Sequence, residues 1–127
     1  MNLEDQVCSL ELAKRLHELG VKQESLFFWW EWQEHTILRY SAYAPEISGE
    51  MPYSAFTVAE LGDMLPSIVL SETKHGSDKH QLEFNHRAGY WQSIYYASIQ
   101  ISDKNESNSR AKILIHLIEN KLMEVPR

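Results

Sequence analysis

Residues 27–32 read Phe-Phe-Trp-Trp-Glu-Trp, which places three of the chain's four tryptophans within four positions. Such bulky side chains favour an extended strand, because a pleated sheet gives them room to pack. Side chains alternate between the two faces of a strand. We therefore expect one face to join the core, formed by Leu26, Phe28, Trp30 and Trp32. Phe27 and Trp29 on the other face are predicted to lie under a helix or to form an interaction surface.

The polar residues 33–35 favour a reversal of the chain into a second strand at 36–43, which completes a hairpin. Residues 44–55 contain Pro45, Gly49 and Pro52, so they are predicted to form a loop. A second hairpin is expected further along, where Leu82 and Phe84 alternate with polar residues and Ala88-Gly89 turns the chain into 90–99. Residues 68–70 suit a brief strand, whereas 71–80 and 102–109 are expected to be irregular.

Helix signals occur in three places. Ser9 can cap a helix over 9–20, with Leu12 and Leu16 on its apolar stripe and Gly20 ending it. Thr57 and Glu60 have the spacing of a capping box, and the helix that they start must end before Pro66. Residues 110–122 form a long helix with a wide apolar face. Its expected core residues are Ala111, Ile113, Leu114, Ile115, Leu117, Ile118 and Leu122.

The predicted order of elements is therefore α-β-β-α-β-β-α within one α+β domain that spans residues 1–127. Hairpins separated by a helix favour an antiparallel sheet of four or five strands packed against three helices. The length of 127 residues also suits one domain with one core.

Composition narrows the classes of function. The formal net charge of −6 gives no general attraction to nucleic acid. Cys8 is the single cysteine, which excludes an intramolecular disulfide, and its apolar neighbours predict a buried thiol. The first residues lack the pattern of a signal peptide, and no apolar run approaches the roughly 20 residues that cross a bilayer. We expect a cytoplasmic protein that does not enter a membrane.

Three stretches carry a resemblance to a family: CSLELAKRLHELGVKQESLFFW at 8–29, YSAFTVAELGDMLP at 53–66 and RAKILIHLIENKL at 110–122. In this order they resemble small uncharacterised proteins encoded by prophages and mobile elements of gut bacteria. The C-terminal half is also similar to small α-β-α sandwich domains of phages. The resemblance implies a bacterial or phage origin and an accessory role, and it implies no activity or catalytic residue.

Catalytic and metal-binding motifs are absent from the sequence. His75, His80 and His86 are spaced by five and six residues, which fits neither helical nor strand ligand pairs, so we expect no metal there. There is no nucleophile elbow, phosphate-binding loop or dinucleotide-binding motif. We therefore expect no enzyme activity and no cofactor.

Nucleic-acid binding is the alternative hypothesis. Residues 9–21 suit the first helix of a helix-turn-helix, but the aromatic segment that follows cannot serve as a recognition helix. A single-strand surface could instead use basic and aromatic residues of the second hairpin. Its candidate residues are Lys74, Lys79, Arg87, Tyr90 and Trp91. Residues 74–87 contain three basic residues and the acidic Asp78 and Glu83, so their net charge is only +1 with histidines neutral. This low charge argues against nucleic-acid binding.

The leading hypothesis is a protein that binds another protein or itself. The chain has four Trp, six Tyr and four Phe, and interfaces are enriched in Trp and Tyr.

Overall fold

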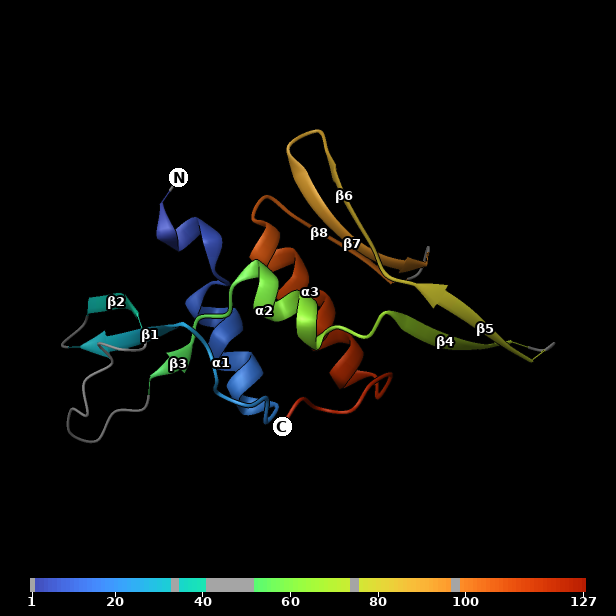
Figure 1. The fold of residues 1–127 in the computed structure, drawn as a ribbon, viewed down its shortest axis with the longest axis horizontal. Coiled ribbons are helices and arrows are strands. Elements are labelled where there is room, and N and C mark those ends of the chain that lie inside the picture. The colour runs from blue at the N-terminus through green and yellow to red at the C-terminus, as the bar shows by residue number, and fades with distance from the viewer. Residues whose placement is uncertain (1, 33–34, 41–51, 74–75, 97–98) are drawn as a thin grey trace.

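The computed structural model describes residues 2–32, 35–40, 52–73, 76–96 and 99–127. It confirms an α+β protein with antiparallel strand pairing (Figure 1). The single sheet of four or five strands was wrong, because the strands of the described residues form three separate sheets. The helices are the 3₁₀ helix η1 (Leu3–Gln6) and the α-helices α1 (Leu10–Glu18), α2 (Val58–Met64) and α3 (Glu106–Glu119). The strands of the N-terminal sheet are β1 (Phe27–Trp32), β2 (His35–Tyr40) and β3 (Tyr53–Ser54). The C-terminal strands are β4 (Ile68–Thr73), β5 (Gly76–Gln81), β6 (Glu83–Arg87), β7 (Tyr90–Tyr96) and β8 (Ile99–Asp103).

The helix signals in the sequence are confirmed. The Ser9 hydroxyl accepts a hydrogen bond from the backbone N–H of Leu12, and Gly20 has φ of +88° beyond the end of α1. Both hydrogen bonds of the capping box between Thr57 and Glu60 are present at the start of α2. α1 does not extend into residues 3–8, because η1 and an extended segment precede it. α3 begins earlier than predicted, since the Asn105 side chain caps it.

The N-terminal sheet has the strand order β2-β1-β3, so the first predicted hairpin is confirmed and β3 is added to it. The assignment of its core face was right for Trp30 and wrong for Leu26, and the side chain of Trp32 lies outside the described part of the structure. Trp29 is only 8% exposed and belongs to the hydrophobic core, with Phe27 packed against that core, whereas Leu26 is 51% exposed. Alternation predicts two faces but does not determine which one α1 covers. Trp30 on the even face is buried as predicted.

The C-terminal strands form a two-stranded ribbon, β4-β5, and a sheet of order β6-β7-β8. The second predicted hairpin is confirmed, with Ala88 and Gly89 both at positive φ in its turn. The prediction of irregular structure at 71–80 was wrong, because β4 continues to Thr73 and β5 begins at Gly76. The one at 102–109 was also wrong over most of its length, because β8 ends at Asp103 and α3 begins at Glu106. β5 is almost entirely polar and lacks the apolar alternation that marks a strand. Its extended conformation is instead supported by pairing with β4.

α3 lies at the centre of the fold, between the C-terminal sheet and the helices α1 and α2 (Figure 1). The predicted core residues within α3 are all buried. The helix ends at Glu119 rather than at the predicted 122, so Leu122 lies beyond it and packs against the core partly buried. Small hydroxyl side chains allow the helix to approach its neighbours closely. The Oγ atoms of Ser93 on β7 and Ser109 on α3 lie 2.9 Å apart, and Ser107 donates a hydrogen bond to the Gln6 carbonyl.

Candidate functional site

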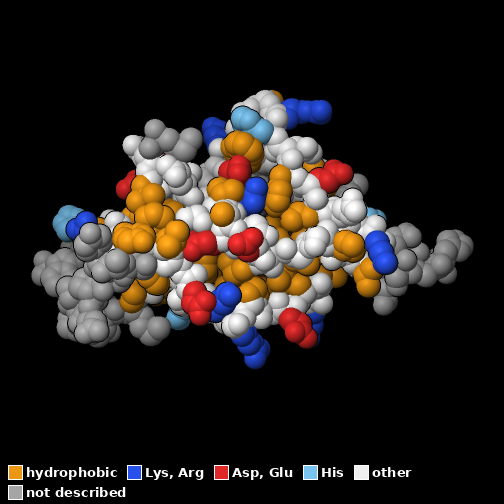
Figure 2. Space-filling model, viewed as in Figure 1, with side chains coloured by type: hydrophobic (Ala, Val, Ile, Leu, Met, Phe, Trp, Pro, Cys, Tyr) orange, Lys and Arg blue, Asp and Glu red, His pale blue; other side chains and the backbone are white. Residues whose placement is uncertain are grey.

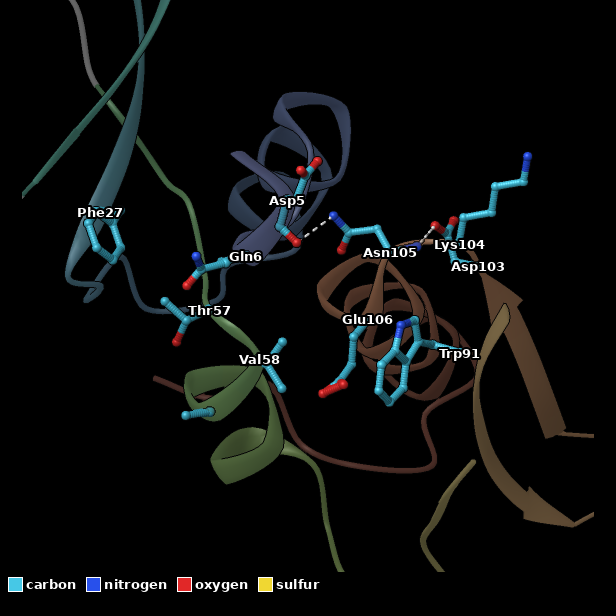
Figure 3. A pocket seen from close by; sticks show the side chains of 11 residues that line it. Asp5, Gln6, Phe27, Thr57, Val58, Trp91, Asp103, Lys104, Asn105 and Glu106 are labelled. Atoms are coloured by element: carbon cyan, nitrogen blue, oxygen red, sulfur yellow. Dashed lines mark hydrogen bonds between the residues drawn. The ribbon is translucent and has the colours of Figure 1, made fainter. Parts of the chain in front are cut away.

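A groove opens where η1, the start of α2, β7 and the junction of β8 with α3 meet (Figure 3). Its volume is about 600 Å³, within the range of small-ligand and side-chain pockets. The residues that shape it at the centre are Gln6, Thr57, Val58, Trp91, Asn105 and Glu106. They come from four segments distant in sequence, and no motif links them. Of the lining residues, sequence reasoning singled out Trp91 and Phe27 as functional candidates, each for a different surface.

The junction of β8 with α3 is rigidly hydrogen-bonded. The Asp103 carboxylate accepts from Lys112 Nζ at 2.6 Å and from the backbone N–H of Asn105 at 2.8 Å. Burial raises the pKa of Asp103, but these hydrogen bonds outweigh it and hold the pKa below its ordinary value. The Asn105 side chain donates to the Asp5 carbonyl at 3.0 Å, which ties this junction to η1. One wall of the groove is thus fixed in place.

Glu106 is the ionised side chain that extends into the groove, between Trp91 and Val58 (Figure 3). Its Oε1 lies 3.5 Å from Nη2 of Arg110, a long ion pair on the same helix. The Arg110 guanidinium also donates to the Val58 carbonyl and lies 3.7 Å from the centroid of the Phe84 ring. Burial of Arg110 lowers its pKa from the ordinary value.

The aromatic wall of the groove is Trp91. His86, its partner in the β6–β7 register, stacks on the indole with ring centroids 4.1 Å apart and planes within 11°. His86 does not line the groove, so the indole presents its remaining surface there. The groove therefore combines an aromatic ring with a carboxylate, on a wall that the hydrogen bonds of Asp103 and Asn105 hold in place.

The predicted interaction residues Phe27 and Trp29 are not exposed together. Trp29 lies in the core, where its indole N–H donates to the Cys8 carbonyl at 2.7 Å, so it cannot contact a partner in this conformation. Phe27 is partly buried and reaches the far edge of the groove. Of the two possibilities for these residues, packing inside the protein is the one observed for Trp29.

The candidate nucleic-acid residues do not form one surface. Tyr90 and Trp91 are consecutive on β7 and so point to opposite faces of the sheet. Trp91 shares its face with Ser93, which packs on α3, whereas Tyr90 is exposed beside its register partner Arg87. Lys79 is exposed on β5 in register with Leu70, and Lys74 lies outside the described residues. A continuous stacking surface is therefore not assembled from these side chains.

Chemistry at the other candidate residues is limited. Burial raises the pKa of the Cys8 thiol to about 12, so it stays protonated and unreactive near neutral pH. No cluster of three or more metal-ligating side chains occurs in the part of the chain that the structure describes. His75 lies outside the described residues, and His86 is engaged with Trp91.

Exposed apolar side chains form a second candidate surface on the ribbon. Ile68 and Leu70 lie on the same face of β4 and are 45% and 53% exposed, whereas Val69 between them is buried in the core. On the face of the molecule seen in Figure 2, hydrophobic side chains lie in separate groups divided by charged and polar ones. Ile68 and Leu70 therefore form a small exposed apolar cluster on one face of β4.

Comparison with known proteins gives no family assignment: no protein-family model, curated protein or solved structure matches the chain. None of the helices in the described ranges is long and apolar enough to span a membrane.

Proposed function

We propose that the chain is a small cytoplasmic accessory protein, of the prophage or mobile-element type that its sequence resembles, and that it acts by binding another protein or a second copy of itself. The observation that carries this proposal is the exposure of Ile68 and Leu70 on one face of β4. Large exposed aliphatic side chains that lie together favour association, because contact removes their surface from water.

The geometry of the ribbon supports the same conclusion. A two-stranded ribbon is marginally stable on its own in water and gains stability when a further layer covers it. β4 and β5 pair over six register positions and extend away from the helices (Figure 1). Val69 on the inner face of β4 is buried in the core. On the outer face Ile68 pairs with Gln81 and Leu70 pairs with Lys79, so polar residues lie beside the two exposed aliphatic ones. An apolar centre with a polar rim is the usual anatomy of a protein interface.

The nucleic-acid alternative has weaker support. The net charge of −6 opposes general attraction to phosphates, and the separation of Tyr90 from Trp91 divides the aromatic residues that stacking would need.

The test is a double variant, Ile68→Ser with Leu70→Ser, compared with Leu26→Ser as a matched exposed control. Sedimentation velocity over a wide concentration range measures self-association, and affinity capture with bait of each variant measures binding to other proteins. We expect the double variant to reduce association or capture while the control leaves it unchanged. A monomeric wild-type chain whose captured proteins do not depend on Ile68 and Leu70 would refute the proposal.

A further inference from the structure

We propose that the groove between Trp91 and Glu106 binds the cationic side chain, arginine or lysine, of a basic segment in a partner protein. This inference concerns a different surface from the ribbon of β4 and β5 and goes beyond the association proposed for it. The inference depends on the charge of the residues that line the groove and on the hydrogen bonds and ion pairs that they already make.

Glu106 supplies the charge. Its ion pair with Arg110 is long, with 3.5 Å between Oε1 and Nη2. A carboxylate can accept about four hydrogen bonds, so Oε2 keeps the capacity to accept from an incoming cation. The other carboxylate at this wall, Asp103, is already engaged by Lys112 and the Asn105 backbone. Glu106 is therefore the group of the groove with acceptor capacity to spare.

The remaining ionised groups at the rim do not cancel this charge. In Figure 3 the Lys104 side chain and the Asp5 carboxylate both extend away from the centre of the groove. Arg110, the counter-ion of Glu106, is not part of the lining and stays held by the Val58 carbonyl and the Phe84 ring. The lining therefore contains Glu106 but not its counter-ion Arg110.

Trp91 supplies the second element of recognition. An indole ring attracts a cation through its electron-rich face, and tryptophan is the aromatic side chain best suited to this contact. His86 covers part of the ring from outside the groove and holds its orientation. Glu106 and Trp91 both line the groove (Figure 3), and in the proposed complex a single guanidinium or ammonium group contacts both.

The experiment is an NMR titration of the full chain, with the four indole N–H resonances assigned through single Trp→Phe variants. The probes are acetylated, amidated Gly/Ser peptides that carry one central arginine or lysine. Matched peptides that carry glutamine or glutamate at that position serve as comparisons. We expect the Trp91 resonance to move saturably with the cationic peptides and not with the other two.

The variants identify the groups responsible. Glu106→Gln keeps the shape of the side chain and is expected to weaken binding at least about fivefold, the size of a lost charge contact on a partly buried site. Glu119→Gln, which removes an exposed charge at the opposite end of α3, is the control and should leave the titration unchanged. Trp91→Phe is expected to weaken binding as well, measured then on backbone resonances of residues 105–107. The dispersion of the amide spectrum verifies that each variant is folded.

A Trp91 resonance that does not respond, that responds equally to the glutamate peptide, or that responds unchanged in Glu106→Gln would overturn the inference. None of these outcomes bears on association through Ile68 and Leu70, which the sedimentation and capture experiments decide separately.

Discussion

The indole N–H of Trp29 donates a 2.7 Å hydrogen bond to the backbone carbonyl of Cys8, across 21 residues of sequence. This contact fixes the N-terminal sheet to the segment that precedes α1. The neighbouring Trp30 is also buried, but its indole N–H has no hydrogen-bond partner among the described residues. The two consecutive tryptophans therefore form a natural pair for measuring what the hydrogen bond contributes.

We predict that Trp29→Phe destabilises the protein by about 1–3 kcal/mol more than Trp30→Phe does, because only the first substitution leaves a buried carbonyl without its donor. Both substitutions remove similar volume, so the difference isolates the hydrogen bond. Urea unfolding followed by circular dichroism measures it. Equal losses of stability would show that the hydrogen bond contributes little.

The buried thiol predicts a specific loss of stability in alkaline solution. Cys8 has its pKa raised from 9.0 to about 12 in the folded protein, so above pH 9 the unfolded chain loses a proton that the folded chain keeps. The stability is therefore full below pH 9 and falls by up to about 1.4 kcal/mol per pH unit above it. Cys8→Ala removes the thiol and its contribution to the pH dependence. The free energy of unfolding is measured for both proteins across pH 8–11, and the difference between the two curves isolates the thiol from other groups that titrate there. Parallel curves would contradict the prediction.

The hydrogen-bonded carboxylate of Asp103 predicts the opposite dependence in acid. Because the pKa of Asp103 is lowered from 3.8 in the folded state, its contribution is present above that value and is lost as the pH falls through the folded-state pKa. We expect Asp103→Asn to be less stable than the wild type at neutral pH and to approach it in strong acid. Asp63→Asn, at an exposed position on α2, is the comparison and should change stability little. A constant difference at all pH values would assign the effect to packing instead.

Two residues with side chains occupy left-handed backbone positions that favour glycine. Lys121, just after α3, has φ of +57°, and Ala88 in the β6–β7 turn has φ of +54°. We predict that Lys121→Gly and Ala88→Gly each stabilise the protein by about 0.5–1 kcal/mol, since glycine carries no steric penalty there. Lys121→Ala keeps the strain and serves as the control. Thermal unfolding resolves such differences, and a loss of stability in both glycine variants would refute the assignment of strain.

The sequence predicted local structure where side chains act on their own backbone. The cap at Ser9, the capping box of Thr57 and Glu60, and the Ala88-Gly89 turn all depend on residues within a few positions, and all were confirmed. The burial of Cys8 and of the apolar face of α3 was also predicted, since both follow from local apolar patterns.

Features that depend on distant partners were not predicted. β5 has a polar sequence and is extended because β4 pairs with it, and the core face of β1 was partly misassigned because α1 and the Cys8 carbonyl select Trp29. The groove was missed for the same reason. Its wall residues Thr57, Trp91 and Glu106 come together only through the packing of α2, β7 and α3, which no local pattern encodes.

The central position of α3 has a consequence for how the protein forms during synthesis. Ser107 donates to the Gln6 carbonyl, Asn105 donates to the Asp5 carbonyl, and the Asn108 side chain accepts from the backbone N–H of Ser9, so α3 and its N-cap close contacts with residues made much earlier. Nascent chains grow from the N-terminus, and segments whose partners are unmade stay exposed to solvent. Until the ribosome releases residues 106–119, α1, α2 and the sheet of β6, β7 and β8 lack the helix on which they pack. The surfaces of α1, α2 and the C-terminal sheet that α3 covers therefore stay exposed until residues 106–119 are made, which makes this interval the time when chaperones or proteases have access to them.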